Sequence, residues 1–134
     1  MDYLKGLNEP QYEAVTTLHG PLMVLAGAGS GKTRVLVERF LYIVEEGKAS
    51  ADAILAITFT RKAAKEMRER VRNTLYTDLL AASKEKREFL EKQLYLLDKA
   101  QISTIDSFCS KVLRENPVEA GVDPQFQVRE EYEI

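Results

Sequence analysis

Three uncharged runs along this chain alternate with segments in which apolar residues recur at helical spacing. Residues 21–26, 53–59 and 102–105 carry no charged side chain, and the first two are almost continuously apolar. Uninterrupted apolar runs of this length are typical of strands buried on both faces of a parallel sheet. We therefore predict three strands at these positions.

The helical segments are defined by their apolar faces. One predicted helix runs from 31 to 46 and is ended by Gly47; its apolar face comprises Leu36, Phe40, Ile43 and Val44. A longer helix is predicted by apolar residues at every fourth position: Ala63, Met67, Val71, Leu75 and Leu79. Further helices are predicted over residues 8–18, 84–99 and 106–114. Asn8 is placed to cap the first of these, and Asn116-Pro117 closes the last.

This alternation of strands and helices predicts an α/β fold, with a parallel sheet, right-handed crossovers and flanking helices. Ligands of such folds bind at the carboxyl ends of the strands. Three segments follow strand ends here, namely residues 26–33, 58–60 and 104–108. We expect all three to line one edge of the sheet.

Composition narrows the class of protein. The 134 residues suffice for one domain with a core, and the formal net charge of −2 argues against a globally basic nucleic-acid-binding protein. A single cysteine, Cys109, and a single histidine, His19, exclude a disulfide framework and a zinc site built from several Cys and His. We interpret Cys109 as a small buried residue. The sequence shows no membrane-spanning stretch and no signal peptide, so we expect a cytoplasmic protein.

The most informative motif is Ala-Gly-Ala-Gly-Ser-Gly-Lys-Thr at residues 26–33, directly after the first predicted strand. Glycines let backbone N–H groups turn toward phosphate oxygens, and the helix beginning near Gly31 adds its positive N-terminal end. Lys32 supplies a charge for the outer phosphates, and the Thr33 hydroxyl can ligate Mg²⁺. This spacing predicts a site for ATP or GTP. The lack of an Asn-Lys-x-Asp segment disfavours GTP.

Two departures from a complete hydrolytic motor stand out. Ala26 occupies the position of the first glycine in G-x-x-x-x-G-K-T, although the later glycines keep the loop flexible. No apolar run is followed by Asp-Glu, the pair that would hold Mg²⁺ and orient the attacking water. Asp52 precedes its strand and Asp106 has no neighbouring Glu. The chain is therefore either a fragment of a longer protein or a module that binds nucleotide without turning it over.

Four segments, in this order, resemble the start of UvrD/Rep-type superfamily 1 DNA helicases. They are LNEPQ at residues 7–11, AGAGSGKT followed by Arg34, AITFTRKAAKEM at residues 56–67, and STIDSFC at residues 103–109. Two further features look most like the AddA and RecB helicase–nuclease branch, namely a helical insert at residues 75–99 and PQFQV at residues 124–128.

This resemblance implies a P-loop NTPase (RecA-like) fold, here an incomplete three-layer α/β/α arrangement. Residues 1–134 would form the N-terminal part of the first motor domain, and residues 117–134 would start an incomplete following segment. The whole enzyme would use ATP and Mg²⁺ to translocate 3′ to 5′ on single-stranded DNA in repair and recombination. DNA ends and a second subunit of a helicase–nuclease complex would be its partners. Without Walker B acids and a second motor domain, the chain alone is expected to hydrolyse ATP poorly.

The resemblance also implies roles at the nucleotide. The cofactor-binding residues would be Gln11, Ala26, Gly27, Ala28, Gly29, Ser30, Gly31, Lys32, Thr33 and Arg34. Lys32 and Thr33 would be catalytic, with Thr33 the metal ligand, and Arg34 would lie near the nucleotide. Gln11 would read adenine, because a carboxamide complements the N6 and N7 edge of that base. Without the family context, Gln11 is interpreted as a surface residue in a first helical turn.

Single-stranded DNA would contact Thr58, Phe59, Thr60, Arg61, Lys62, Thr104 and Ser107. Phe59 either offers a stacking face that tolerates any base or packs in the core at its strand end. The basic run at residues 61–72 is either a solvated helix face or, near its start, a phosphate contact. A carboxylate would repel phosphate, so we interpret Asp106 as a helix N-cap.

Two other function classes share the phosphate loop. A small-molecule or nucleoside kinase needs an acceptor site and a lid with clustered arginines, and this sequence has no clear lid. A non-catalytic nucleotide-binding module would bind ATP with Mg²⁺ but would show neither turnover nor DNA affinity.

Overall fold

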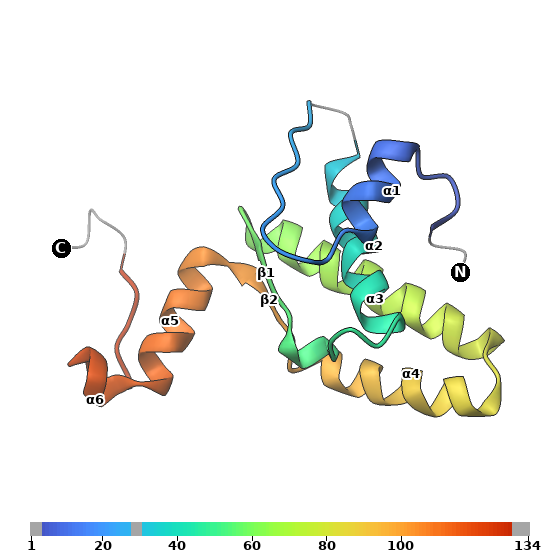
Figure 1. Ribbon diagram of the computed structural model, residues 1–134. Helices are drawn as coiled ribbons and strands as arrows, with labels where there is room; N and C mark the ends of the chain where they lie inside the picture. Colours follow the sequence, from blue (N-terminus) through green and yellow to red (C-terminus); the bar gives the residue numbers. More distant parts are fainter. Residues whose placement is uncertain (1–3, 28–30, 130–134) are drawn as a thin grey trace.

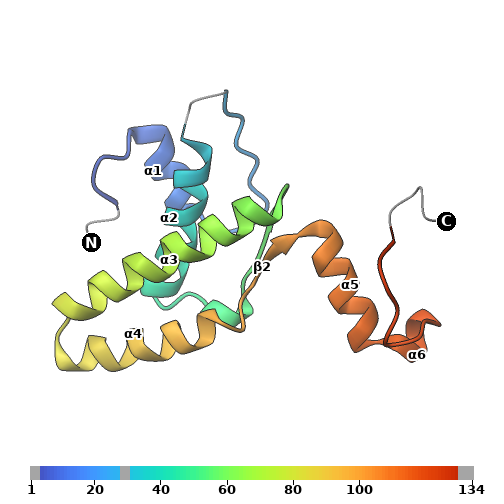
Figure 2. The ribbon, with the colours of Figure 1, turned by 180° about the vertical axis from the view of Figure 1, so that it is seen from behind.

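The computed structural model describes residues 4–27 and 31–129 and arranges helices around a small parallel sheet (Figures 1 and 2). In chain order the elements are α1 (Glu9–Thr16), α2 (Lys32–Glu45), the 3-10 turn η2 (Ala51–Ala53), β1 (Leu55–Thr58), α3 (Arg61–Ala81), α4 (Lys84–Leu97), β2 (Gln101–Thr104), α5 (Ile105–Glu115) and α6 (Pro117–Ala120). This helix-rich arrangement agrees with the predicted α/β class. Among the described residues, no helix has both the length and the apolar character needed to cross a bilayer.

Helix starts are fixed by local hydrogen bonds that the sequence specifies. In α1, the Asn8 side chain accepts from the Gln11 backbone N–H at 2.9 Å, and the Gln11 side chain accepts from the Asn8 N–H at 3.0 Å. This is a capping box, which satisfies two backbone donors that have no partner within the helix. In α3, the Thr60 hydroxyl accepts from the Ala63 N–H at 3.0 Å.

β1 and β2 are parallel neighbours, in register from Leu55 opposite Gln101 to Thr58 opposite Thr104. The crossover between them contains α3 and α4, an antiparallel pair seen clearly in Figure 2. Side chains alternate along β1, so Ala56 is buried while its neighbours Leu55 and Ile57 are exposed. One face of the sheet therefore packs into the core, and the other is left open by the described residues.

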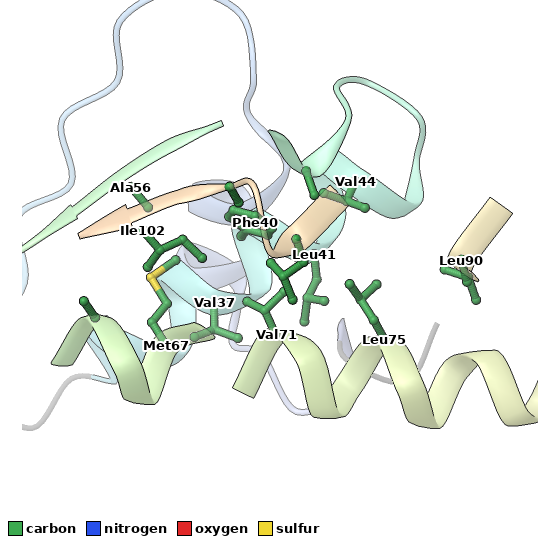
Figure 3. Packing of buried hydrophobic residues seen from close by; sticks show 14 of the residues in the cluster. Val37, Phe40, Leu41, Val44, Ala56, Met67, Val71, Leu75, Leu90 and Ile102 are labelled. Carbon is green, nitrogen blue, oxygen red and sulfur yellow. The ribbon is translucent and has the colours of Figure 1, made fainter. Parts of the chain in front are cut away.

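The core lies between the buried sheet face, α2 and the α3–α4 pair (Figure 3). Its largest fully buried side chains on these helices are Phe40, Leu41, Val44, Met67, Val71, Leu75, Leu90 and Leu97. Arg68 of α3 ties this core to the start of β2, because its guanidinium donates to the carbonyls of Leu97 at 2.7 Å and Ala100 at 3.0 Å. The four-residue spacing predicted for α3 is confirmed from Met67 to Leu79.

The strand predicted at residues 21–26 is wrong. Residues 21–27 adopt no strand pairing, and the side chains of Met23 and Leu25 are 83% and 89% exposed. Figure 1 shows this segment as an extended trace that leads toward α2. A strand exists only where a neighbour accepts and donates its backbone hydrogen bonds, and β1 pairs here with β2. The apolar pattern indicates that the segment tends to be buried, but it does not indicate whether another strand lies beside it.

Two smaller predictions about α5 are also wrong. Thr104, not Asp106, is the N-cap of α5, because β2 ends there and its hydroxyl accepts from the Ser107 N–H at 3.2 Å. Asp106 lies in the first turn instead. Cys109 is exposed rather than buried, since α5 extends away from the core and has no fully buried residue (Figure 1).

Candidate nucleotide site and strand-end surface

A cavity of about 670 Å³ lies between α1, residues 21–27 and the first half of α2. Apolar side chains form much of its wall: Ala14, Leu22, Val24, Leu25, Val35 and Leu36. Polar and charged groups reach it from both helices: Asn8, Gln11, Lys32 and Arg39. A concave, mostly apolar site with a few polar groups is the usual form of a small-molecule site.

The charged end of the cavity is the start of α2. Gly31 is the N-cap of this helix with φ 77°, a left-handed conformation that glycine adopts without strain. Ala26, Gly27 and Lys32 line the cavity, and Thr33 follows in the exposed first turn of α2. The first N–H groups of a helix have no partner within it, and together with the helix dipole they favour an anion here. The predicted site residues Ala28, Gly29 and Ser30 lie outside the described residues.

Gln11 lies against the end of the phosphate loop. Its Nε2 atom is 3.4 Å from where a Cβ on Gly31 would stand, and the residue lines the cavity. Its Oε1 atom accepts the Asn8 N–H in the capping box. The structure thus brings Gln11 and Lys32 to one cavity and adds a capping role for Gln11. That role was visible in the sequence, as Asn8-x-x-Gln11 has the spacing of a capping box.

The Arg34 side chain contacts α2 and the segment before α1. Its Nε donates to Glu38 Oε1 at 3.1 Å, and its NH2 group donates to the Lys5 carbonyl at 2.9 Å. A side chain at Gly6 would meet the guanidinium at 3.2 Å. Arg34 therefore holds the segment before α1 against α2.

Arg39 is a residue of this site that sequence reasoning missed. It lies in α2, lines the cavity and donates to the carbonyls of Ala14 at 2.6 Å and Thr17 at 2.7 Å. Nothing in its sequence neighbourhood distinguishes it from the other arginines of the chain. Its role depends on how α1 packs on α2.

A second candidate surface lies at the carboxyl ends of β1 and β2. The Thr58 hydroxyl donates to the Thr60 carbonyl at 3.1 Å, and Thr60 caps α3. Phe59, between them, is fully exposed. The alternative that Phe59 packs in the core is therefore wrong. Arg61 and Lys62 follow as exposed residues in the first turn of α3.

The neighbouring strand contributes a similar arrangement. Thr104 caps α5, and its hydroxyl donates to Ser107 Oγ at 3.0 Å. The starts of α3 and α5 thus share one edge with two cationic side chains and the exposed aromatic ring of Phe59. Helix N-termini favour anions, so this edge suits a phosphate backbone. Of the three segments predicted to share an edge, two follow the paired strand ends at Thr58 and Thr104, namely residues 58–60 and 104–108. The described residues of the phosphate loop, 26–27 and 31–33, pair with neither strand.

Comparison with known proteins agrees with this picture. Residues 7–134 match the family model described as UvrD/REP helicase N-terminal domain. The chain is similar to proteins named as ATP-dependent helicase/nuclease subunits, with 42% identity over 126 residues in Heliobacterium modesticaldum, 45% over 127 in Thermoanaerobacter sp. (strain X514) and 43% over 128 in Exiguobacterium sibiricum. These alignments cover 94%, 93% and 94% of the chain but only 9%, 10% and 11% of the respective relatives. The chain spans about a tenth of the length of these curated relatives.

Proposed function

Because the chain belongs to the UvrD/REP helicase N-terminal domain family, we propose that it is the ATP-binding portion of an ATP-dependent DNA helicase. One observation carries the proposal: Gln11 of α1 and Lys32 of α2, from separate sequence motifs, line the same cavity. The protein would form the N-terminal part of a first RecA-like motor domain. Residues 75–99 would be a helical insert in it, and residues 117–134 would begin the segment that follows.

The residues that line the cavity fit a nucleoside triphosphate. Lys32 and the N–H groups at the start of α2 would hold the phosphates, and the apolar walls would enclose the base. Gln11 would hydrogen-bond the adenine edge. Mg²⁺, with Thr33 as a ligand, would neutralise phosphate charge. This chain supplies binding and orientation, and we assign it no residue that activates a water molecule.

The strand-end surface would hold single-stranded DNA. Phe59 offers an unobstructed ring on which a base can stack, whatever the base. Arg61 and Lys62 supply positive charge beside it, and the hydroxyl groups of Thr58, Thr60, Thr104 and Ser107 stand at the two helix starts. Stacking combined with phosphate contacts gives sequence-independent binding, which a translocating enzyme requires.

The activity of the whole protein extends beyond this chain. The relatives are named as ATP-dependent helicase/nuclease subunits, and by analogy the complete protein would hydrolyse ATP, move 3′ to 5′ on single-stranded DNA and act at DNA ends with a second subunit. Two motor domains would close on ATP. A chain with one partial motor domain would bind nucleotide but turn it over slowly.

Nucleotide binding and turnover test this proposal together. A fluorescent ATP analogue with Mg²⁺ should bind the chain and be displaced by ATP, while the ATPase rate with single-stranded DNA should stay near background. A turnover rate like that of a complete helicase would contradict the argument that this is a partial motor. Transfer of phosphate from ATP to a nucleoside would favour a kinase. Binding of ATP without any DNA affinity would favour a non-catalytic module.

A further inference from the structure

Arg39 joins the two helices that form opposite walls of the nucleotide cavity. Its NH1 group donates to the carbonyls of Ala14 and Thr17, at 2.6 and 2.7 Å. Both carbonyls are at the C-terminal end of α1, where the last carbonyls of a helix lack partners within it. The last turn of α1 contains no basic residue of its own. A cation on α2 therefore supplies the favourable charge that this helix end lacks.

The orientation of α1 depends on such contacts because the helix is short. Its eight residues are fewer than an isolated helix needs to be stable in water, and only Ala14 and Val15 are buried. Arg34 fixes the chain before α1 through the Lys5 carbonyl, and Arg39 fixes the end of α1. Two arginines of α2 thus hold α1, one at the segment before its start and the other at its C-terminal end.

Gln11 lies between these two attachments, three residues before Ala14. Its Nε2 stands against Gly31, where α2 begins, so its position relative to the phosphate site is set by how α1 sits on α2. Small displacements of a hydrogen-bonding group weaken it steeply, because the bond needs a narrow range of distance and angle. Loss of the Arg39 contacts would free α1 to move while leaving Lys32 and the start of α2 in place.

We propose that Arg39 is a positioning residue for base recognition: it fixes α1 on α2 so that Gln11 meets adenine when Lys32 holds the phosphates. This inference rests on the proposed function. Although Arg39 lines the cavity, its NH1 group is engaged by two carbonyls of α1, so its proposed role is exerted through Gln11. Removal of Arg39 should therefore change the preference among bases more than the affinity for phosphate.

The test compares three ligands on the full chain: ATP, GTP and inorganic tripolyphosphate, each competing with a fluorescent ATP analogue. Arg39→Gln should reduce the preference for ATP over GTP roughly tenfold, the equivalent of one hydrogen bond, while tripolyphosphate affinity changes less than about twofold. Arg39→Lys, which keeps the charge and the donors, should restore much of the preference. Arg87→Gln, an exposed arginine of α4, should behave as wild type.

A second variant separates positioning from general loss of structure. In a Gln11→Ala background the preference should already be lost, and adding Arg39→Gln should lower it no further. A further decrease would overturn the inference, because Arg39 would then act independently of Gln11. Should Arg39→Gln fail to fold by circular dichroism, Arg39→Met, which keeps an unbranched side chain but has no donor, carries the same comparison. A preference for ATP unchanged from wild type in a folded Arg39→Gln or Arg39→Met variant also overturns the inference.

Measurements on the wild-type protein distinguish a failure of this inference from a failure of the proposed function. If wild type binds none of the three ligands, the proposed nucleotide site fails and the inference falls with it. If wild type binds tripolyphosphate as well as ATP, the phosphate site stands and base reading by Gln11 fails. If wild type prefers ATP and the folded Arg39→Gln variant keeps that preference, only the role of Arg39 is overturned.

Discussion

Thr58 and Thr104 are register partners at the last pair of positions of β1 and β2, and a helix starts within three residues of each strand end. Thr104 caps α5 itself, and Thr58 donates to the carbonyl of Thr60, which caps α3. Parallel pairing alone brings these two segments together, because the carboxyl ends of parallel strands lie at the same edge. The starts of α3 and α5 therefore lie at one edge of the sheet.

Lys32→Ala should strongly weaken the binding of nucleoside triphosphates. A charge-assisted contact contributes about 1.5–3 kcal/mol, which corresponds to a loss of roughly 10- to 100-fold in affinity. Fluorescence titration with an ATP analogue measures this loss. Lys48→Ala, another exposed lysine beyond the end of α2, is the control and should bind as wild type. Equal affinities in the two variants would show that the cavity is not the phosphate site.

Gly31→Ala should weaken both folding and nucleotide binding. Its φ of 77° is strained for alanine by about 1–2 kcal/mol, and the new Cβ would lie 3.4 Å from Gln11 Nε2. Gly47 provides a matched control, because its φ is 68° and a Cβ there would meet nothing within 4 Å. Gly47→Ala should therefore lose similar stability in thermal unfolding while keeping the ATP affinity of wild type. Equal binding losses in both variants would trace the effect to stability alone.

Phe59→Ala should reduce the affinity for single-stranded DNA without changing stability. The ring is fully exposed, so its removal exposes no core, whereas one stacked base contributes about 1–3 kcal/mol. Fluorescence anisotropy with a labelled oligothymidine should show roughly 5- to 100-fold weaker binding. Tyr76→Ala, an exposed aromatic residue within α3, serves as the comparison. DNA affinity that survives in Phe59→Ala would argue against this edge as the DNA surface.

Glu45 makes the stability of the fold depend on pH. Burial, reinforced by a hydrogen bond with Asp78 and by the charge of that carboxylate, raises the pKa of Glu45 from 4.5 to about 8. The positive charge of Lys86 acts in the opposite direction. The folded protein thus keeps a proton that the unfolded chain releases above its pKa of 4.5. The free energy of unfolding should therefore fall as the pH rises from about 4.5 to about 8.

Glu45→Gln should remove most of this slope. The amide stays neutral and can still donate to Asp78, so the variant should be more stable than wild type at about pH 8 and similar to it near pH 4. Urea unfolding at several pH values measures the difference. Glu46→Gln changes the neighbouring, exposed carboxylate and should keep the wild-type slope. An unaltered slope in Glu45→Gln would mean that another group carries the pH dependence.

Much of the local structure could be predicted from the chain itself. The cap of α1 at Asn8, the end of α2 near Gly47 and the apolar face of α3 all follow from interactions within a few residues. The same holds for the phosphate motif, whose glycine at position 31 adopts the positive φ that such a turn needs. The start of α1, the end of α2 and the apolar face of α3 depend on neighbours in sequence, and these three predictions are confirmed.

Features that depend on distant neighbours could not be predicted in this way. Residues 21–27 have the composition of a strand but no adjacent strand in the described chain. Cys109 is of a residue type that is usually buried, but it lies on α5, which has no buried residue. Both predictions were wrong because the residue types indicate a tendency to be buried, but they do not indicate which other part of the chain packs against them. The hydrogen bonds from Arg39 to α1 were not predicted, because their acceptors are backbone carbonyls, which every residue has.

The sequence alone determined which chemical groups this chain offers to the proposed nucleotide and DNA sites: a lysine after a glycine loop, a carboxamide in a capped helix, and an aromatic residue at a strand end. Tertiary structure decided which of them share a site. Lys32 and Gln11 meet because α1 lies on α2, and the helix starts at Thr60 and Thr104 meet because β1 pairs with β2. Helix caps and turns close over three or four residues, whereas a cavity or a sheet edge exists only once long-range packing has brought distant segments together.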